Sequence, residues 1–285
     1  MKSEIIYSNK ANFEKTLDNL IKRLSSSSLH FLADFDRTLT KSFSSDWEKR
    51  PSLISVLRKE WYLSEEYSKQ AYALFDKYHP IEADPQIDLE EKKKQMSIWW
   101  ESHLDLLVKS WLNLSDISKV VDSWIIQLRD GCEEMFEMLN SKNIPIVIIS
   151  ANWLGTDSIK LYLQKNDLDY PNIHIISNSF NYDSNWYVTS YNYPVIHTFN
   201  KDETVLSELP EIYDIVKNRK DVILLWDSLW DHHMIDGFDY DNLLKIGFLN
   251  ENIQDNLEEY QKRYDVLITN DWDISFVNDL LKNIL

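Results

Sequence analysis

The chain places two carboxylates and a hydroxyl group directly after an apolar segment. His30–Thr40 reads HFLADFDRTLT, so Asp34, Asp36 and Thr38 follow a run that is typical of a buried strand. Side chains two residues apart on an extended backbone point the same way, so the two aspartates face a common space. Two carboxylates this close repel each other unless they share a proton or a cation, which favours a hard metal ion such as Mg²⁺. The alternative is a polar loop with an Asx-turn, because Asp and Thr are common turn residues.

Three further apolar runs are followed by polar or charged residues that could take part in the same reaction. Ser150 follows IPIVIIS, Lys201 follows VIHTFN, and Asp227 and Asp231 follow VILLW. Taken singly, Ser150 is a simple helix N-cap and Lys201 a solvated residue at a helix start. Ligands of open parallel sheets bind outside the carboxyl ends of the strands, so these side chains are expected to meet there. Together they predict Mg²⁺-assisted phosphoryl transfer, in which metal and lysine neutralise phosphate oxygens while a carboxylate attacks.

Strand-like and helix-like segments alternate on both sides of one long helical stretch, which predicts parallel βαβ units. We therefore expect an α/β fold with a doubly wound, mainly parallel sheet. The expected strands are Leu29–Ala33, Ile144–Ser150, Ile173–Ser177, Val222–Trp226, Leu243–Leu249 and Tyr264–Thr269. The expected helices are Asn12–Leu24, Cys132–Ser141, Thr156–Lys165, Thr204–Val216, Asn252–Arg263 and Ile274–Leu285. Tyr182–Tyr193 is expected to form a short hairpin or loop of unassigned role.

The segment 44–128 shows only amphipathic helical periodicity and is expected to form an all-helical cap inserted after the first strand. Residues 1–43 and 129–285 would then form the catalytic core.

Composition narrows the function further. The 285 residues are 44% hydrophobic, which allows a large core, and the net charge is −17. So acidic a chain is not expected to bind a nucleic acid polymer or an anionic membrane. Its four glycines form no phosphate-binding P-loop, and its single cysteine, Cys132, fits a reducing compartment. No apolar run approaches the length of a membrane span, so a cytoplasmic location is expected.

The motifs together resemble those of haloacid-dehalogenase-type phosphatases: DFDRTLT, Ser150 in ISAN, Lys201 in HTFNK, and WDSLWD. More narrowly, the chain resembles the cytosolic pyrimidine 5′-nucleotidase family (cytosolic 5′-nucleotidase III type). This likeness rests on YHPIEADP, WWESHLDLL, LRDGCEEMFEMLNSKNIPIVIISA and LLKIGFLNENIQDNLEEYQKRYDVLI, and extends over nearly the whole chain from the first strand onward.

The resemblance implies a role for each motif residue. Asp34 would be the nucleophile that forms an aspartyl-phosphate, and Asp36 the general acid and later the base. Mg²⁺ would be held by Asp34, the main-chain carbonyl of Asp36, and Asp227. The phosphate would be bound by Thr38, Ser150 and Lys201, with Asp231 orienting Lys201 or metal-bound water.

The resemblance also places recognition of the base in the helical cap. The matching residues are Glu90, Glu91, Trp99, Trp100 and His103. Stacking on an aromatic ring and a carboxylate that accepts from a base amino group would supply the binding. The alternative for Trp99 and Trp100 is that they are core residues of an amphipathic helix.

Three residues depart from the family pattern. Trp226 and Trp230 stand where the family usually has glycine, and Asn152 lies in a turn that is usually smaller. We expect Trp226 to narrow the substrate pocket. The alternative is a place in the core between sheet and helices.

The predicted function is Mg²⁺-dependent hydrolysis of a nucleoside 5′-monophosphate, with pyrimidines preferred. Two alternatives remain open at this stage: a phosphatase that acts on another small phosphorylated metabolite, and a catalytically impaired protein that only binds its ligand.

Overall fold

Apolar segments rich in Ile, Val and Leu build the central sheet, as is usual for strands buried on both faces. The computed structural model describes residues 4–23, 27–59, 62–123, 125–201, 209–229, 235 and 239–285. In these residues, seven strands form one sheet in the order β1-β9-β8-β7-β2-β3-β4. Neighbouring strands are parallel except β1 and β9, which are antiparallel. The predicted α/β fold with a mainly parallel sheet is confirmed.

The elements of the described part have the following bounds. The strands are β1 (Ile5–Tyr7), β2 (Leu29–Ala33), β3 (Ile146–Ser150), β4 (Ile173–Ser177), β5 (Phe180–Tyr182), β6 (Val188–Tyr191), β7 (Asp221–Trp226), β8 (Asn242–Leu249) and β9 (Val266–Thr269). The helices are α1 (Lys10–Arg23), η1 (Phe35–Leu39), α2 (Leu53–Lys59), α3 (Glu65–Ala83), α4 (Leu89–Lys109), α5 (Leu114–Val121), α6 (Cys132–Ser141), α7 (Gly155–Lys165), α9 (Pro210–Val216), α10 (Ile253–Gln261) and α11 (Ser275–Ile284).

Alternate residues of the central strands enter two separate hydrophobic clusters, one on each face of the sheet. In β2, Phe31 and Ala33 belong to the larger cluster, whereas Leu32 belongs to the smaller one. In β3, Ile148 belongs to the larger cluster and Val147 to the smaller one. This period of two follows from the pleat of the strands. Burial on both faces fixes the register that brings the strand ends together.

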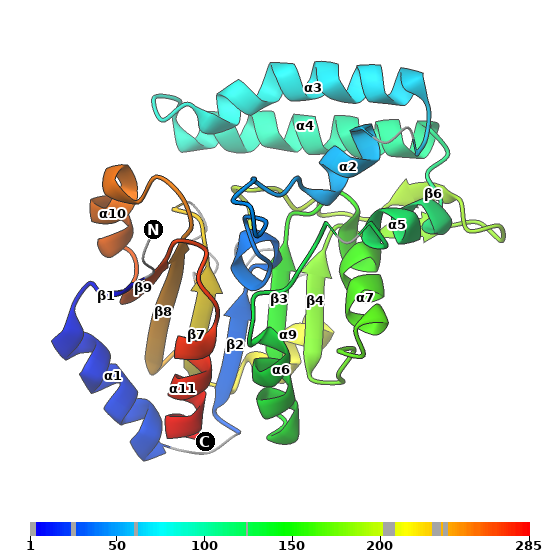
Figure 1. The fold of residues 1–285 in the computed structure, drawn as a ribbon. Coiled ribbons are helices and arrows are strands. Elements are labelled where there is room, and N and C mark those ends of the chain that lie inside the picture. Colours follow the sequence, from blue (N-terminus) through cyan, green and yellow to red (C-terminus); the bar gives the residue numbers. More distant parts are fainter. Residues whose placement is uncertain are drawn as a thin grey trace.

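Helices α2 to α5 are inserted between β2 and α6, and α3 and α4 form a pair that lies beyond the carboxyl ends of the strands (Figure 1). The two connections to this helical layer run side by side. Thr40 and Leu128 form an antiparallel bridge, and the amide of Lys41 donates to the carbonyl of Gln127 at 2.8 Å. Of the predicted boundaries of the cap, 128 lies within this paired stem and 44 lies three residues beyond it.

Several predicted elements match the structure residue for residue, among them β2, β4 and α6. Tyr182–Tyr193 falls on the two-stranded β5-β6 hairpin, as expected. The prediction missed β1. It was wrong to treat VIHTFN as a strand, because residues 194–200 form an irregular segment with a turn. The predicted helix Thr204–Val216 is seen as α9, and its residues 204–208 lie outside the described part.

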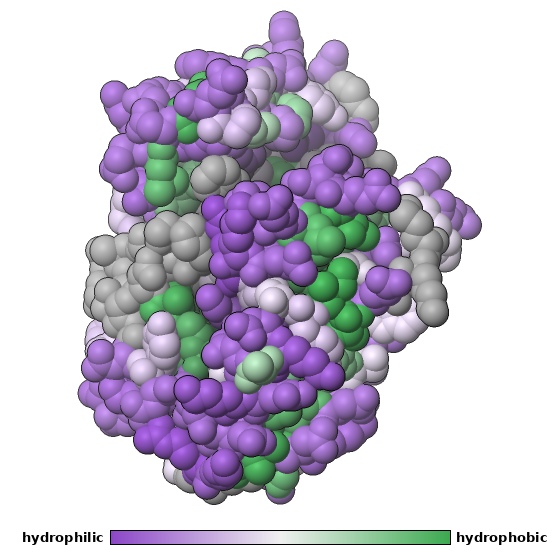
Figure 2. Space-filling model, turned by 90° about the vertical axis from the view of Figure 1, so that its left-hand side faces the viewer, coloured by the Kyte–Doolittle hydropathy of each residue, from purple (hydrophilic) through white to green (hydrophobic). Residues whose placement is uncertain are grey.

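The face of the molecule drawn in Figure 2 is mostly hydrophilic, with apolar residues gathered in smaller patches. Among the described residues, no helix combines the length and the apolarity that crossing a membrane requires.

Candidate active site

A tight turn after β2 presents the acidic motif. Asp36 has extended dihedral angles and Arg37 a φ of 62°, so the chain reverses within η1 instead of continuing as a helix. The hydroxyl group of Thr40 accepts from the amide of Arg37 at 2.8 Å, and the amide of Thr40 donates to the carbonyl of Phe35. These bonds fix the backbone that carries Asp34, Asp36 and Thr38 at the strand end.

Asp34, Asp36, Ser150, Lys201 and Asp227 line one cavity of about 260 Å³, whereas Thr38 is not among its lining residues. Lys201 Nζ lies 2.7 Å from Oδ1 of Asp34, and both side chains are buried. Thr38 is buried and donates to Oδ1 of Asp227 at 3.4 Å. The lining of the cavity includes Asp34, Asp36, Ser150, Asn152, Trp153, Thr198, Lys201 and Asp227.

Asp36 has the protonation behaviour that a general acid needs. Burial and, next in size, the negative charge of Asp34 raise the pKa of the Asp36 carboxyl group to about 6, although Lys201 and Arg37 act in the opposite direction. A carboxyl group with such a pKa holds a proton in a substantial part of the molecules near neutral pH.

Ser150 and Asn152 shape the second side of the cavity. Ser150 ends β3 and is buried, and its hydroxyl group accepts from the amide of Asn152 at 3.2 Å. The side chain of Asn152 turns back onto its own loop, where Oδ1 accepts from the amide of Leu154 at 2.8 Å. The Asn152 side chain therefore stabilises the turn as an Asx-turn.

Lys201 reaches the site from an irregular segment that side-chain amides hold in place. Asn178 binds both the amide and the carbonyl of Ile196, each at 2.9 Å. Asn200 accepts from the amide of His197 and donates to the carbonyl of Val195. These bonds satisfy the backbone without a strand ladder, which is why an apolar run here does not pair with the sheet.

The donor set at the cavity fits Mg²⁺ in kind. Asp34 and Asp227 offer carboxylates, and Asp36 offers a main-chain carbonyl, which are the hard oxygen ligands this ion prefers. Among the described residues, no group of three or more His, Cys, Asp or Glu side chains is arranged to hold a metal ion. Asp231 and Trp230 lie outside the described residues.

A buried arginine binds the main chain of the turn that carries the acidic motif. Arg129 donates to the carbonyls of Thr38, at 2.6 Å, and of Arg37, and its guanidinium pairs with Asp271 at 2.9 Å. Asp271 in turn accepts from the amide of Ser42 at 2.8 Å. Together, the bonds of Arg129 and Asp271 join the acidic turn to both connections of the helical layer.

A wider cleft of about 640 Å³ lies between the helical layer and the core. It shares Arg37, Ser52, Trp153 and Thr198 with the strand-end cavity, so the two spaces adjoin. Aromatic rings form much of its wall: Phe75 stacks on His79 at 4.6 Å, and Trp100 on Trp153 at 4.1 Å.

Hydrogen bonds join helices α3 and α4 to the core across this cleft. The indole of Trp100 donates to the carbonyl of Ala151 at 3.0 Å, next to the loop of Ser150. The hydroxyl group of Thr198 donates to Oε1 of Glu82 in α3 at 2.7 Å. The helical layer thus closes directly over the strand-end cavity.

The structure brings only part of the predicted base-binding set to the cleft. Trp99 and Trp100 line it, although both are almost completely buried and also pack as core residues. His103 is buried beside Tyr67, whose hydroxyl group lies 3.1 Å from Nε2, and it does not line the cleft. Glu90 and Glu91 are exposed in the first turn of α4, away from the lining residues.

The prediction overlooked Glu82, which supplies the one carboxylate among the described residues that line the cleft. Glu82 lies within YHPIEADP, a segment that had already carried the family resemblance. Glu82 lies in the last turn of α3, and its side chain reaches the core through the hydrogen bond from Thr198.

Comparison with known proteins identifies the family. The model of the pyrimidine 5′-nucleotidase (UMPH-1) family matches residues 37–285. The chain belongs to this family. It is 33% identical over 266 residues to the 7-methylguanosine phosphate-specific 5′-nucleotidase of Gallus gallus, covering 93% of this chain and 91% of that one. The Homo sapiens protein of the same name is 34% identical over 258 residues, covering 90% and 85%.

A solved structure extends the likeness to the fold. Cytosolic 5′-nucleotidase IIIB bound to cytidine superimposes with a TM-score of 0.87 at 28% identity, covering 98% of this chain and 92% of that one. A phosphoserine phosphatase, solved as an analogue of its phospho-aspartyl intermediate, shares the fold with a TM-score of 0.52 at 18% identity. The chain is thus a phosphatase of the 5′-nucleotidase type.

Trp226 of this nucleotidase family member does not narrow the substrate pocket, contrary to our expectation. Its side chain is 1% exposed and packs in the smaller core cluster, edge-on to Tyr264 at 5.8 Å. Opposite it in the sheet stands Gly247, where a Cβ atom would lie 2.7 Å from the ring of Tyr264. The glycine makes room for Tyr264, and the alternation along β7 turns Trp226 to the same face.

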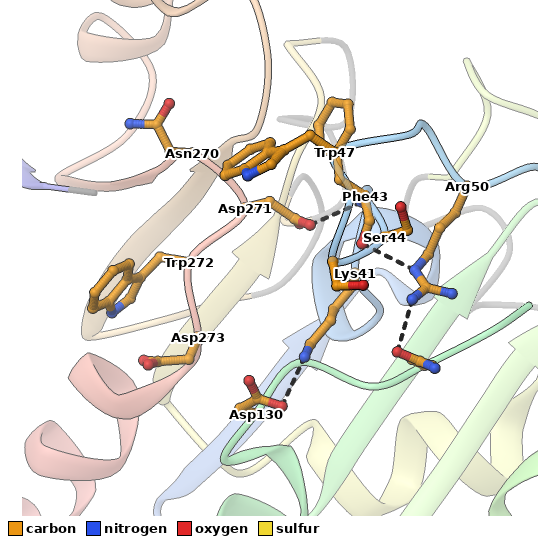
Figure 3. Close-up of a pocket in the computed structure, with 12 residues that line it drawn as sticks. Lys41, Phe43, Ser44, Trp47, Arg50, Asp130, Asn270, Asp271, Trp272 and Asp273 are labelled. Atoms are coloured by element: carbon orange, nitrogen blue, oxygen red, sulfur yellow. Dashed lines mark hydrogen bonds and ion pairs between the residues drawn. The ribbon is translucent and has the colours of Figure 1, made fainter. Parts of the chain in front are cut away.

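A second cavity of about 490 Å³ lies apart from the strand-end site, between the outgoing connection and the β9–α11 loop (Figure 3). Trp47 and Trp272 contribute exposed indoles, and Lys41 pairs with Asp130 at 2.8 Å. None of the predicted catalytic residues lines this cavity.

Proposed function

We propose that the protein is a Mg²⁺-dependent phosphomonoesterase that hydrolyses nucleoside 5′-monophosphates, pyrimidines among them, through an aspartyl-phosphate on Asp34. One observation carries the proposal: the buried Lys201–Asp34 pair lies in a cavity that opens into an aromatic cleft under the helical layer. Family membership supports the reaction class. The matched structure, which holds cytidine, supports a nucleoside in the cleft.

Each polar residue at the strand ends has its own role in the proposed phosphoryl transfer. Asp34 attacks phosphorus, and its Oδ1 is already held by the ammonium group of Lys201. Lys201, Thr38 and Ser150 bind the phosphate oxygens and neutralise or solvate the charge that develops on them. Bound Mg²⁺ would add charge neutralisation at the phosphate, held by Asp34, Asp227 and the carbonyl of Asp36.

Asp36 transfers the proton in both half-reactions. Its raised pKa lets it donate a proton to the departing 5′-oxygen of the nucleoside, and it then accepts a proton from the water that attacks the aspartyl-phosphate. The helical layer over the cavity limits access of bulk water, which keeps the carboxyl group desolvated.

The cleft is the site for the nucleoside. Its aromatic walls offer stacking to a base, and Glu82 offers a carboxylate to an exocyclic amino group. We infer a cytosolic location as well, which the name of the matched nucleotidase structure supports.

Phosphate release from a panel of nucleoside 5′-monophosphates and from p-nitrophenyl phosphate tests the proposal. With Mg²⁺, both kinds of substrate should be hydrolysed, and EDTA should stop the reaction. Hydrolysis of p-nitrophenyl phosphate without any turnover of nucleotides would refute the substrate class. No Mg²⁺-dependent hydrolysis of any phosphomonoester would refute the activity.

A further inference from the structure

The cleft under the helical layer is lined by many more cations than anions, although the whole chain carries a net charge of −17. Glu82 is its one carboxylate among the described residues. The cationic residues that line it are Arg37, Lys49, Arg50, Arg58 and Lys59.

Most of this positive charge is already engaged near the connections to the core. Glu251 lies 2.6 Å from Lys49 and 3.9 Å from Arg37, so one carboxylate serves two cations. Arg50 donates to the carbonyls of Phe43 and Ile125 and to the side-chain oxygen of Gln127, which are neutral acceptors. Lys49 and Arg37 are therefore paired with an anion, and Arg50, although its acceptors are neutral, is held at the connections and not in the aromatic part of the cleft.

Arg58 differs because it belongs to the aromatic part of the cleft. Its guanidinium carbon lies 5.0 Å from the ring centre of Phe75 and 5.6 Å from that of Tyr72, and the residue is only 5% exposed. Its hydrogen bonds go to the carbonyl of Ile54, at 3.3 Å, and to the hydroxyl group of Ser55, at 3.2 Å. Among the described residues, no carboxylate lies within ion-pair distance of Arg58, and Asp76 acts on it only from farther away.

A desolvated guanidinium with neutral partners exerts a strong field on its surroundings, since little solvent screens it. It attracts a base that presents carbonyl oxygens and repels a base that carries a positive charge. The relatives named for 7-methylguanosine phosphate act, by that name, on a purine whose methylated ring is cationic.

We propose that Arg58 sets the charge preference of the base cleft, so that this protein favours nucleotides with neutral, carbonyl-bearing bases and discriminates against a cationic base such as 7-methylguanine. The inference deepens the proposed function and rests on the cleft being the nucleoside site. It predicts a departure from the specificity that the names of the relatives state.

The test compares GMP with its 7-methyl derivative, which differ by one methyl group and one positive charge, at mildly acidic pH. In the wild type, kcat/KM should be higher for GMP. The Arg58→Met substitution should shift the ratio of the two kcat/KM values toward the methylated nucleotide by about tenfold or more. Arg58→Lys keeps the charge and should keep the preference. Lys69→Met, which removes an exposed cation from α3, is the matched control and should leave the ratio unchanged.

A wild type that prefers the methylated nucleotide, or an Arg58→Met variant with an unchanged ratio, overturns the inference. If Arg58→Met does not fold, Arg58→Gln replaces it. The ratio of kcat/KM for GMP over its 7-methyl derivative in the wild type still tests the inference. Absence of hydrolysis with every phosphomonoester would instead refute the proposed function. Calorimetric binding of guanosine and 7-methylguanosine would then test Arg58 independently of catalysis, with tighter binding of the methylated nucleoside by the wild type overturning the inference.

Discussion

Lys201 Nζ lies 2.7 Å from Oδ1 of Asp34, with the two side chains 8% and 6% exposed. The two residues are far apart in sequence and come from different kinds of structure, a strand end and an irregular segment. The ammonium group of Lys201 donates a charge-assisted hydrogen bond to the Asp34 carboxylate and fixes its position. This contact holds Asp34 at the position from which the proposed attack on phosphorus would occur.

Asp36→Asn should impair the enzyme most on substrates with poor leaving groups. The amide cannot donate the proton that the 5′-oxygen of a nucleoside needs, whereas p-nitrophenolate leaves without protonation. We expect kcat/KM, which reports formation of the aspartyl-phosphate and not its hydrolysis, to fall about tenfold more for CMP than for p-nitrophenyl phosphate. Steady-state rates on both substrates check this, and equal losses would remove Asp36 from the role of acid.

Glu82→Gln should change the ranking of nucleotides, because the amide loses the negative charge that favours a base amino group. The ratio of kcat/KM for CMP over UMP should fall by about tenfold. Glu90→Gln and Glu91→Gln are matched controls on the exposed first turn of α4 and should leave the ratio within about twofold. A shift caused by Glu90 or Glu91 instead would restore the original sequence-based assignment.

Trp226→Ala should destabilise the fold by about 3–5 kcal/mol without changing substrate preference, because the indole fills the core beside Tyr264. Trp272→Ala, at an indole 43% exposed, is the control and should change the free energy of unfolding by less than about 0.5 kcal/mol. Denaturant unfolding beside a nucleotide panel measures both effects. A higher kcat/KM of Trp226→Ala for bulky nucleotides would show that the indole of Trp226 borders the substrate pocket.

His103 should make the protein less stable in mild acid. Burial, aided by the positive charge of Arg58, lowers its pKa to about 3, against an ordinary value of 6.5. Between these values the unfolded chain binds a proton that the native state does not, so stability falls as pH falls through this window, by up to about 1.4 kcal/mol per pH unit. His30, with a pKa lowered to about 4, adds to the effect.

The His103→Gln substitution keeps a hydrogen-bonding group near Tyr67 and removes the titration. Its free energy of unfolding should therefore depend less steeply on pH between 6.5 and 4 than that of the wild type. Urea unfolding at several pH values measures the slopes. Identical slopes would mean that His103 is not buried in its neutral form.

The sequence predicted well where one physical rule decides the outcome. Strands buried on both faces appear as continuous apolar runs, so β2, β3 and β7 were found, and parallel pairing then brought Asp34, Ser150 and Asp227 to one cavity. The π-type turn at Arg37, with its positive φ, left no signal, since arginine has no preference for that conformation.

The cleft was harder to predict because tertiary packing decides which face of each helix meets the core. Periodicity marks Trp99, Trp100 and His103 alike as apolar-face residues, and only packing separates the first two from His103. Glu82 and Arg58 come from two different helices, so their meeting at one cleft depends on how α2 and α3 dock.

The most direct test of the account is to locate the covalent phosphate. Wild-type protein is mixed with labelled CMP and Mg²⁺, quenched rapidly in acid, and mapped by mass spectrometry, with Asp34→Asn as control. We predict a phosphate on Asp34 that hydroxylamine removes, and a folded Asp34→Asn variant with neither the label nor turnover. Phosphate on another residue, or sustained Mg²⁺-dependent turnover by folded Asp34→Asn, would contradict the account.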